Sequence, residues 1–358
     1  MRRTLFLSLI VLAAAAGAEG AAPNRDRVSR YFEGWYSFCP GTQVTVTDAA
    51  DVSITGYEAY RVERHCELKN RNEINVALVD PAKNEIFVGE VLYDASRRGK
   101  PFSAATDAPA IESVLTEAYG VPASLHVETG SRGPLLPIRV SLQEAPRATA
   151  KFSGFVSEDG AALLLGEFRP LNVDAAAYRE KVIAESKGVR PPKGKFYVTA
   201  FIDFQCERCR QRTPQIRDFV WSRGGGLEIR FLPLVKVHDW SFAAAESAAA
   251  LSNVSPELYT KYEDAVFPRA ASMNAEAARQ VAADVADAAG ARPAYEAELS
   301  SGRASERVIR DIEMALRLGL SGTPAFFYRG QFLTGEKGLA EKAIESGMAN
   351  PAPGATSR

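Results

Sequence analysis

The sequence predicts two folded domains, an α+β domain rich in strands followed by an α/β domain with a long helical insertion. Its 358 residues are enough for about two domains of ordinary size. Runs with the two-residue period of strands dominate residues 24–170. In the second half, a strand-like run ends at Cys206-Glu207-Arg208-Cys209, and a helix-compatible segment follows at once. A block of Ala-rich amphipathic helices comes next, so the two halves predict different architectures.

Residues 1–22 have the composition of a secretory signal peptide. Arg2 and Arg3 provide the positive start, Leu5 to Ala16 the apolar stretch, and Ala16-Gly17-Ala18 the small-residue cleavage site. The apolar stretch is shorter than the roughly 20 residues that span a bilayer. We expect an exported, soluble protein, periplasmic or secreted, without membrane insertion. The balance of 43 Lys and Arg against 44 Asp and Glu gives no indication of nucleic acid as a partner.

Residues 24–170 predict the α+β domain. One helix is expected from Ala108 to Tyr119, because apolar residues recur on one face, and Asp159-Gly160 is a hairpin turn signal. Strands are expected at 43–47, 75–79, 85–93, 136–142 and 161–168. An aromatic cluster could be a binding surface, but core packing is the better interpretation. Its members are Tyr31, Phe32, Trp35, Tyr36 and Phe38. We find no catalytic constellation in this domain.

A connecting helix and linker occupy residues 171–194. The helix is expected over 172–188 with Asn172 or Asp174 as its cap, and Gly and Pro residues then break the pattern. The second domain is expected from 195 to 348, and a disordered tail over 349–358. Its elements are strands at 195–204 and 227–234, helices at 210–221, 242–254, 257–266, 275–289, 305–320 and 338–346, and a hairpin of 324–328 with 331–333.

Four cysteines in an exported protein suggest two disulfide pairs. Cys39 and Cys66 are expected to form a structural disulfide, since no thiolate-activating helix start lies near them in the sequence. Closing a loop of this size restricts the unfolded chain by roughly 3–4 kcal/mol in the entropic model. Cys206 and Cys209 form the second pair.

The Cys206-x-x-Cys209 motif predicts redox chemistry. Cys206 is expected at a helix N-terminus, where unpaired N–H groups and the helix dipole stabilise a thiolate. Cys209 follows one turn later, near enough to close a disulfide with it. No second cysteine pair has the spacing of zinc ligands, and Arg210 stands where c-type haem attachment requires a histidine. We expect no cofactor and no metal, although metal handling by these cysteines with His238 stays an alternative.

The second domain resembles the DsbA-like branch of the thioredoxin superfamily, an α/β thioredoxin fold with an inserted helical subdomain, here at about 239–320. The resemblance covers nearly all of 195–348 and is strongest in three stretches. They are Phe201-x-Asp203-Phe204-Gln205-Cys206-x-x-Cys209, Leu232-Pro233-Leu234 through His238 to Ala250, and Gly319 through Thr323-Pro324 to Phe327 with Gly330. The resemblance implies that the Thr323-Pro324 bond is cis, that Pro324 faces the cysteines, and that Thr323 offers its backbone to an extended substrate segment.

The disulfide isomerases DsbC and DsbG resemble the sequence at further positions. Like them, it has a small apolar residue, Ala200, six positions before the first cysteine, Asp203 three positions before it, and Thr323 before the proline. Their order of signal peptide, N-terminal domain, connecting helix and thioredoxin-like domain is also similar. However, the first domain here is much longer than theirs, and Glu207-Arg208 between the cysteines is unusual for these families.

The resemblance implies an exported thiol–disulfide oxidoreductase that acts on protein disulfides. Cys206 exchanges as the thiolate and Cys209 resolves the mixed disulfide. Arg208 and the helix start are expected to lower the pKa of Cys206, and Glu207 is expected to raise it. We expect an enzyme more like an isomerase or reductase than an oxidase.

Two alternatives stay open for this activity: a DsbA-like dithiol oxidase, and a chaperone or binding module with incidental cysteines. The expected partners are protein substrates with thiols or disulfides and a redox partner protein. The first domain is expected to serve recognition or assembly. Homodimerisation is a hypothesis only.

Overall fold

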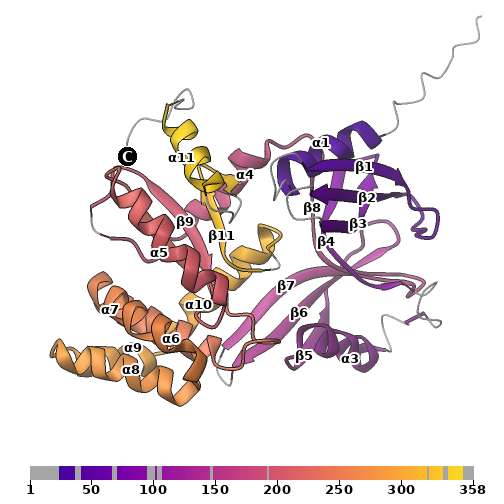
Figure 1. Cartoon of the computed structure of the whole chain (residues 1–358). Coiled ribbons are helices and arrows are strands. Elements are labelled where there is room, and N and C mark those ends of the chain that lie inside the picture. The colour runs from indigo at the N-terminus through magenta and orange to yellow at the C-terminus, as the bar shows by residue number, and fades with distance from the viewer. Residues whose placement is uncertain are drawn as a thin grey trace, which may run out of the picture.

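The computed structural model of the chain describes residues 24–36, 42–66, 71–94, 101–102, 107–145, 148–191, 193–320, 322–333 and 338–349. These residues build two separate β-sheets with helices around them (Figure 1). The expected signal peptide lies outside the described residues, as does the expected tail except for Ala349, which ends a helix. Every described helix falls short of the length and apolarity that crossing a membrane requires.

The first sheet has eight strands in the order β1-β2-β3-β4-β8-β7-β6-β5, and every pair is antiparallel. The hairpin turn at Asp159-Gly160 joins β7 to β8, as expected. Gly160 has φ +67°, and a Cβ there would lie 1.2 Å from the carbonyl oxygen of Phe102, so glycine is required. The strands are β1 Gln43–Asp48, β2 Glu58–Cys66, β3 Arg71–Asp80, β4 Glu85–Asp94, β5 Ala123–Val127, β6 Leu135–Ala145, β7 Ala148–Ser157 and β8 Ala162–Pro170. Those at β2, β5 and β7 had no counterpart in the sequence prediction.

Two helices cover parts of this sheet. The helix α3, Ala108–Tyr119, has the predicted bounds, buries Ile111 and Leu115, and ends at Gly120 in the left-handed conformation. The helix α1, Arg25–Tyr36, was not predicted, because its aromatic residues were interpreted only as a cluster. Tyr31 and Phe32 of α1 are buried in the core with strands β2 to β4, which confirms core packing for these two. The side chains of the other three aromatic residues lie outside the described part of the chain.

The second sheet has four strands in the order β10-β9-β11-β12. The strands are β9 Tyr197–Ile202, β10 Gly226–Phe231, β11 Ala325–Tyr328 and β12 Gln331–Leu333. β9 and β10 are parallel, whereas β11 runs antiparallel to both of its neighbours. The helix α5, Glu207–Trp221, connects β9 to β10, and α11, Leu339–Ala349, follows β12. This strand order and connection are those of a thioredoxin fold, as expected for this part of the chain.

A helical block separates β10 from β11 in the sequence. Its elements are α6 Ser241–Val254, α7 Pro256–Val266, the 3₁₀-helix η2 Phe267–Ser272, α8 Ala275–Ala288, α9 Arg292–Ser300 and α10 Arg303–Arg317. Of these, α9 and η2 were not predicted. The block packs beside the sheet on the side of β10 (Figure 1). The helices from α6 to α10 thus lie within residues 239–320.

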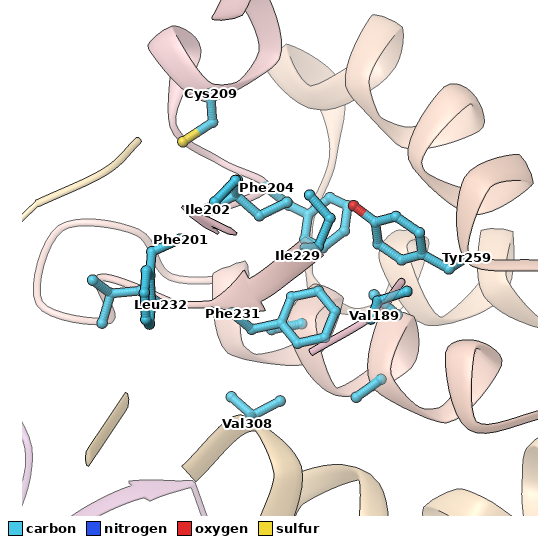
Figure 2. Packing of buried hydrophobic residues seen from close by; sticks show 14 of the residues in the cluster. Val189, Phe201, Ile202, Phe204, Cys209, Ile229, Phe231, Leu232, Tyr259 and Val308 are labelled. Carbon is cyan, nitrogen blue, oxygen red and sulfur yellow. The ribbon is translucent and has the colours of Figure 1, made fainter. Parts of the chain in front are cut away.

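Aromatic and aliphatic side chains hold β9, β10 and the helical block together (Figure 2). Phe201 and Phe204 are fully buried, and the ring of Phe204 lies 5.4 Å from that of Tyr262 in α7. β9 is buried along nearly its whole length, which explains its continuous apolar run in place of an alternating pattern. Cys209 is a fully buried member of this cluster, so the cysteine motif is packed against it (Figure 2).

The linker after α4, Ala175–Ala184, is attached to the edge of the second sheet. Asp174 caps α4 by accepting a hydrogen bond from the N–H of Ala177 at 2.7 Å, as one of the two predicted caps. Val189 and Ile229 of β10 exchange two backbone hydrogen bonds of 2.9 and 2.8 Å. The predicted helix over 172–188 is shorter than expected: α4 ends at Ala184 with Glu185 as its C-cap, and the chain then runs on to the bridge at Val189.

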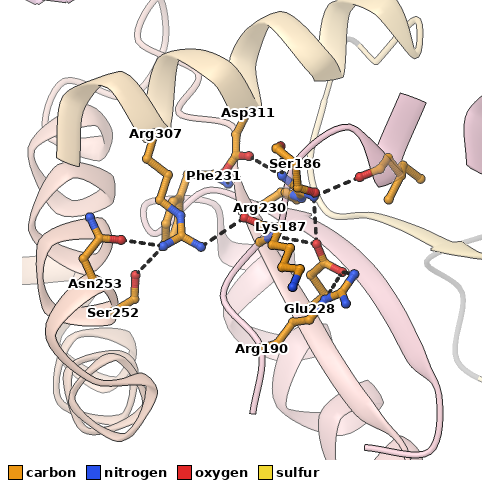
Figure 3. Close-up of polar contacts among 12 residues, drawn as sticks. Ser186, Lys187, Arg190, Glu228, Arg230, Phe231, Ser252, Asn253, Arg307 and Asp311 are labelled. Atoms are coloured by element: carbon orange, nitrogen blue, oxygen red, sulfur yellow. Dashed lines mark hydrogen bonds and ion pairs between the residues drawn. The ribbon is translucent and has the colours of Figure 1, made fainter. Parts of the chain in front are cut away.

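A buried ionic network lies beneath this linker (Figure 3). Arg230 of β10 is fully buried and pairs with Glu228 at 2.7 Å and with Asp311 of α10 at 3.0 Å. It also donates to the hydroxyl of Ser186 at 2.7 Å and to the carbonyl of Ile183 at 3.1 Å. One guanidinium thus joins the linker, the sheet and the inserted helices.

The first domain contacts the thioredoxin fold along β7, at β8 and at the end of α3. β7 lies along α10, where Ala148 and Ala150 belong to the same apolar cluster as the second sheet (Figure 1). The ammonium of Lys236, in the loop after β10, donates to the carbonyls of Glu117 and Ala118 at 3.2 and 2.5 Å. These are the last carbonyls of α3, where a cation is favourable. The loop after β10 is therefore fixed to the end of α3.

Candidate active site

Cys206 occupies the N-cap position of α5, as the sequence predicts. A turn after β9 brings it there: the carboxylate of Asp203 accepts the N–H of Gln205 at 2.7 Å, and the carbonyl of Asp203 accepts the N–H of Cys206 at 3.2 Å. The carbonyl of Cys206 accepts the first helical hydrogen bond from Arg210. Only 9% of Cys206 is exposed.

Cys209 lies one helical turn further on and is fully buried. Its sulfur accepts a hydrogen bond from the backbone N–H of Asp203 at 3.5 Å. Both cysteines are free thiols in the structure. Of the two cysteines, only Cys206 therefore has any exposed surface.

Thr323 and Pro324 lie beside Cys206. The bond between them is cis, which confirms the expectation, and Sγ of Cys206 lies 3.4 Å from the carbonyl oxygen of Thr323. The hydroxyl of Thr323 is buried and has no hydrogen-bond partner among the described residues. It is therefore free to donate to a charged sulfur nearby. The binding of an extended substrate segment at Thr323 and Pro324 stays a prediction.

The pKa values of the two thiols are shifted in opposite directions. The pKa of Cys206 falls to about 6, chiefly because the Cys209 thiol donates a hydrogen bond to the Cys206 thiolate. The Thr323 side chain also lowers this pKa, whereas burial and the charge of Asp203 raise it. The pKa of Cys209 rises well above its ordinary value, first through burial and then through its hydrogen bond with Cys206. Cys206 is thus the thiolate at neutral pH, and Cys209 keeps its proton.

Glu207 and Arg208 are not among the principal causes of the shift at Cys206. The carboxylate of Glu207 accepts a hydrogen bond from the side chain of Gln211 at 3.1 Å. The tuning roles assigned to these two residues stay predictions. The sequence did not indicate the contribution of Cys209, because the distance and direction of its S–H group depend on the helix geometry.

His238 is directed toward Asp203. Its Nδ1 lies 2.8 Å from Oδ2 of Asp203, which leaves that nitrogen no free lone pair for a metal ion. Within the part of the chain that the structure describes, no three His, Cys, Asp or Glu side chains gather in the manner of a metal site. The side chain of Gln205 also reaches this loop, donating to Asp239 and accepting from the N–H of Trp240. The loop after β10 and the cysteine turn therefore form one hydrogen-bonded unit.

The expected disulfide between Cys39 and Cys66 falls outside the described residues, since Cys39 and the side chain of Cys66 are not among them. It stays a prediction. Among the residues that matter at the site, Asp203 was quoted only for its position before the first cysteine. No signal in the sequence connects it to His238, which lies 35 positions further on.

Three comparisons place these observations among known proteins. Residues 191–344 match a family model described as thioredoxin. Among curated proteins, the Na(+)/H(+) antiporter NhaA 3 of Salinispora tropica is 26% identical over 155 residues, which are 39% of this chain and 21% of the antiporter. The chain therefore spans only about a fifth of the length of that curated relative.

Solved structures of low sequence identity are also similar to the chain. They include the thiol-disulfide exchange protein α-DsbA2 of Wolbachia pipientis, with 14% identity and a TM-score of 0.41 over 50% of this chain and 100% of that one. The catalytic domain of Proteus mirabilis ScsC has 15% identity and a TM-score of 0.41 over 49% and 98%. A thioredoxin-like oxidoreductase of Silicibacter pomeroyi has 19% identity and a TM-score of 0.40 over 48% and 98%.

Proposed function

We propose that the protein is a thiol–disulfide oxidoreductase of the DsbA-like type acting on protein substrates, on the premise that residues 191–344 form a thioredoxin-fold domain. One observation carries the proposal. The pKa of the accessible thiol, Cys206, is lowered to about 6, whereas that of its buried neighbour Cys209 is raised. A nucleophilic thiol needs a lowered pKa and a protected resolving thiol needs a raised one, whereas a structural cysteine pair needs neither.

The exchange proceeds in two steps. The Cys206 thiolate attacks one sulfur of a substrate disulfide; that S–S bond breaks, a mixed disulfide forms, and the second substrate sulfur leaves as a thiolate and takes up a proton. Cys209 then loses its proton and attacks Sγ of Cys206, which releases the first substrate sulfur. Two electrons pass from the dithiol to the substrate, and the reverse sequence oxidises a substrate dithiol.

The direction we propose is that of an isomerase or reductase more than that of a strong oxidase. The first cysteine has a pKa near 7 in thioredoxin and about 3.5 in the strong oxidant DsbA. At about 6, Cys206 lies nearer to the reducing end of this range. The charge of Asp203 contributes to this position, because it opposes the thiolate. A DsbA-like dithiol oxidase is the alternative in the same chemical class.

Export and recognition complete the proposal. The composition of residues 1–22 supports export to an oxidising compartment, where such chemistry is useful. The helix α3 of the first domain contacts the loop beside the cysteines through Lys236, which supports a role for that domain in recognising substrates or in assembly. The partners are protein substrates and a redox partner protein that restores the dithiol or the disulfide.

The test uses the full-length protein and two variants. Wild type is expected to reduce a protein disulfide and to unscramble a misfolded disulfide protein in the presence of glutathione. Cys206→Ala is expected to lose both activities, and Cys209→Ala to accumulate a mixed disulfide with substrate. Retention of all activity by Cys206→Ala would show a binding module with incidental cysteines. Oxidation of reduced substrate without any unscrambling would show a plain oxidase.

A further inference from the structure

Val237 is the most exposed of the large apolar side chains that the structure describes, at 68%. It lies in the loop after β10, residues 232–240, and β10 is the neighbour of the strand that leads to the cysteines. A single exposed valine is common on protein surfaces and indicates nothing by itself. The arrangement of its neighbours distinguishes this one.

The polar side chains beside this valine are all engaged within the protein. The ammonium of Lys236 donates to two carbonyls at the end of α3, at 3.2 and 2.5 Å. The ring of His238 contacts Asp203 at 2.8 Å, and the carboxylate of Asp239 accepts a hydrogen bond from the side chain of Gln205 at 3.1 Å. The loop therefore gives its polar groups partners and leaves its apolar side chain in water, which is the reverse of the usual surface pattern. This exposure does not stabilise the fold, because little apolar area is buried there.

The loop is fixed to the residues that precede Cys206. The N–H of Leu234 and the ring of His238 both contact the carboxylate of Asp203, each at 2.8 Å. The carbonyl of Asp203 in turn accepts the N–H of Cys206 at 3.2 Å. The valine stands between Leu234 and His238 in the chain, so these contacts set its position relative to the nucleophile.

The valine itself is held in place. The N–H groups of Val237 and His238 both donate to the carbonyl of Leu234, at 2.9 Å each, which closes a turn. The side chain of Lys236 lies over Gly120, where an added Cβ would be 3.1 Å from it. A valine side chain also has few rotamers, because it branches at Cβ. An apolar contact with Val237 therefore costs little conformational entropy.

The chemistry of such a contact indicates a class of substrate. Cysteine is among the residue types most often buried, so the residues around a protein disulfide are commonly apolar. They come into water when the protein is misfolded, close to the disulfide that has to be exchanged. An exposed apolar side chain near the nucleophile buries part of that surface, whereas it gains nothing from a disulfide with polar surroundings.

We propose that Val237 is a substrate-binding residue of this site, which contacts an apolar side chain within a few residues of the reacting cysteine in a misfolded protein. The inference rests on the proposed function, in which Cys206 forms a mixed disulfide with such a substrate. It assigns to the loop after β10 a selectivity for disulfides with apolar surroundings. The first domain supports this selectivity, because α3 holds Lys236, the residue before the valine.

The test compares two substrates of the reduced full-length protein. Each is a disulfide-linked dimer of one short peptide that has a central cysteine and lysine at both ends. The residues that flank the cysteine are leucine in one dimer and serine in the other. The Cys206 thiolate attacks either sulfur, one peptide leaves as a thiol, and Cys209 displaces the second, so the protein ends as the disulfide. Acid quenching, alkylation and mass spectrometry give the rate constant of this single turnover.

Wild type is expected to reduce the leucine dimer faster than the serine dimer. In Val237→Ser, the ratio of the two rate constants should fall about three- to tenfold, because the apolar contact is lost. Val237→Ile should retain or raise the ratio. Val127→Ser is the matched control: it replaces a valine that is 38% exposed on the edge strand β5, and it should leave the ratio unchanged. Val237→Thr, which keeps the shape of valine, carries the test if Val237→Ser does not fold.

Equal ratios in wild type and Val237→Ser would overturn the inference. Equal losses with both dimers would also overturn it, because they would show a general effect on Cys206. A second measurement separates the inference from the proposed function: the nuclear magnetic resonance signals of the Val237 methyl groups are followed while the leucine peptide, with serine in place of its cysteine, is added. Shifted signals in a protein that reduces neither dimer would support the contact and contradict the function, and unshifted signals in such a protein would contradict both. An unchanged ratio in a protein that reduces both dimers would support the function and contradict the contact.

Discussion

Removing the S–H group of Cys209 tests why Cys206 is a thiolate. The largest cause of its lowered pKa is the hydrogen bond that the protonated Cys209 donates. A hydrogen bond to a charged group contributes roughly 1.5–3 kcal/mol, and about 1.4 kcal/mol corresponds to a tenfold change in an ionisation constant. Cys209→Val deletes this donor at similar volume. We therefore expect the pKa of Cys206 to rise from about 6 to between roughly 7 and 8.

The assay is the rate of Cys206 alkylation as a function of pH. In wild type, the rate should fall as the pH drops through about 6, because the thiolate is lost there. In Cys209→Val, the alkylation rate should fall at a pH about one to two units higher than in wild type. Cys209→Ser is the matched control, because a hydroxyl still donates to the thiolate and should keep the low midpoint. An unchanged midpoint in Cys209→Val, or equal midpoints in both variants, would refute the hydrogen bond as the cause.

Four further predictions concern the site and its supports. Thr323→Val removes the assisting hydroxyl, and the pKa of Cys206 should rise by on the order of one in the same assay, with Thr323→Ser unchanged. Arg230→Met leaves the buried carboxylate of Asp311 without Arg230 and Glu228 with Arg190 alone, and should destabilise the protein by about 3–5 kcal/mol in urea unfolding, whereas replacing Arg190, at the exposed edge of the same network, should cost much less. Lys236→Met removes the contact with the end of α3 and should speed hydrogen exchange in the loop after β10, with about 0.3–1 kcal/mol lost. Cys39→Ser should destabilise the non-reduced protein by roughly 2–5 kcal/mol, and peptide mapping of wild type that found Cys39 or Cys66 as a free thiol would contradict the disulfide.

The sequence predicted the features of the site that depend on local pattern. The strand, the Cys206-x-x-Cys209 turn and the helix are continuous in the chain, so their order alone placed Cys206 at a helix start. The resemblance supplied the cis bond before Pro324, a residue more than a hundred positions away that no periodicity connects to the cysteines. The helix over 108–119 was predicted with its final bounds, because its apolar face is regular and Gly120 ends it.

What the sequence did not predict depends on contacts between distant residues. In the sequence, Arg230 is only a charged residue within a predicted strand. Its ion-pair partner, Asp311, lies 81 positions later on an inserted helix. Asp203 was noted only as a position in a motif, whereas in the structure its carboxylate contacts His238 and Leu234 in the loop after β10. β7 was missed because Ala148, Ala150 and Gly154 give its strand pattern few large apolar residues, and its burial comes from packing against α10.

The reduction potential of the Cys206–Cys209 couple tests the central claim most directly. The full-length protein is equilibrated with graded ratios of reduced and oxidised glutathione, alkylated and digested with trypsin. Cleavage after Arg208 separates the two cysteines, so their peptides stay joined only in the disulfide form. We predict a reversible two-electron transition between about −270 mV, the thioredoxin value, and about −180 mV, the value of protein disulfide isomerase. A transition near −120 mV would contradict the isomerase or reductase assignment. Cysteines that stay unlinked at every ratio would contradict the redox site itself.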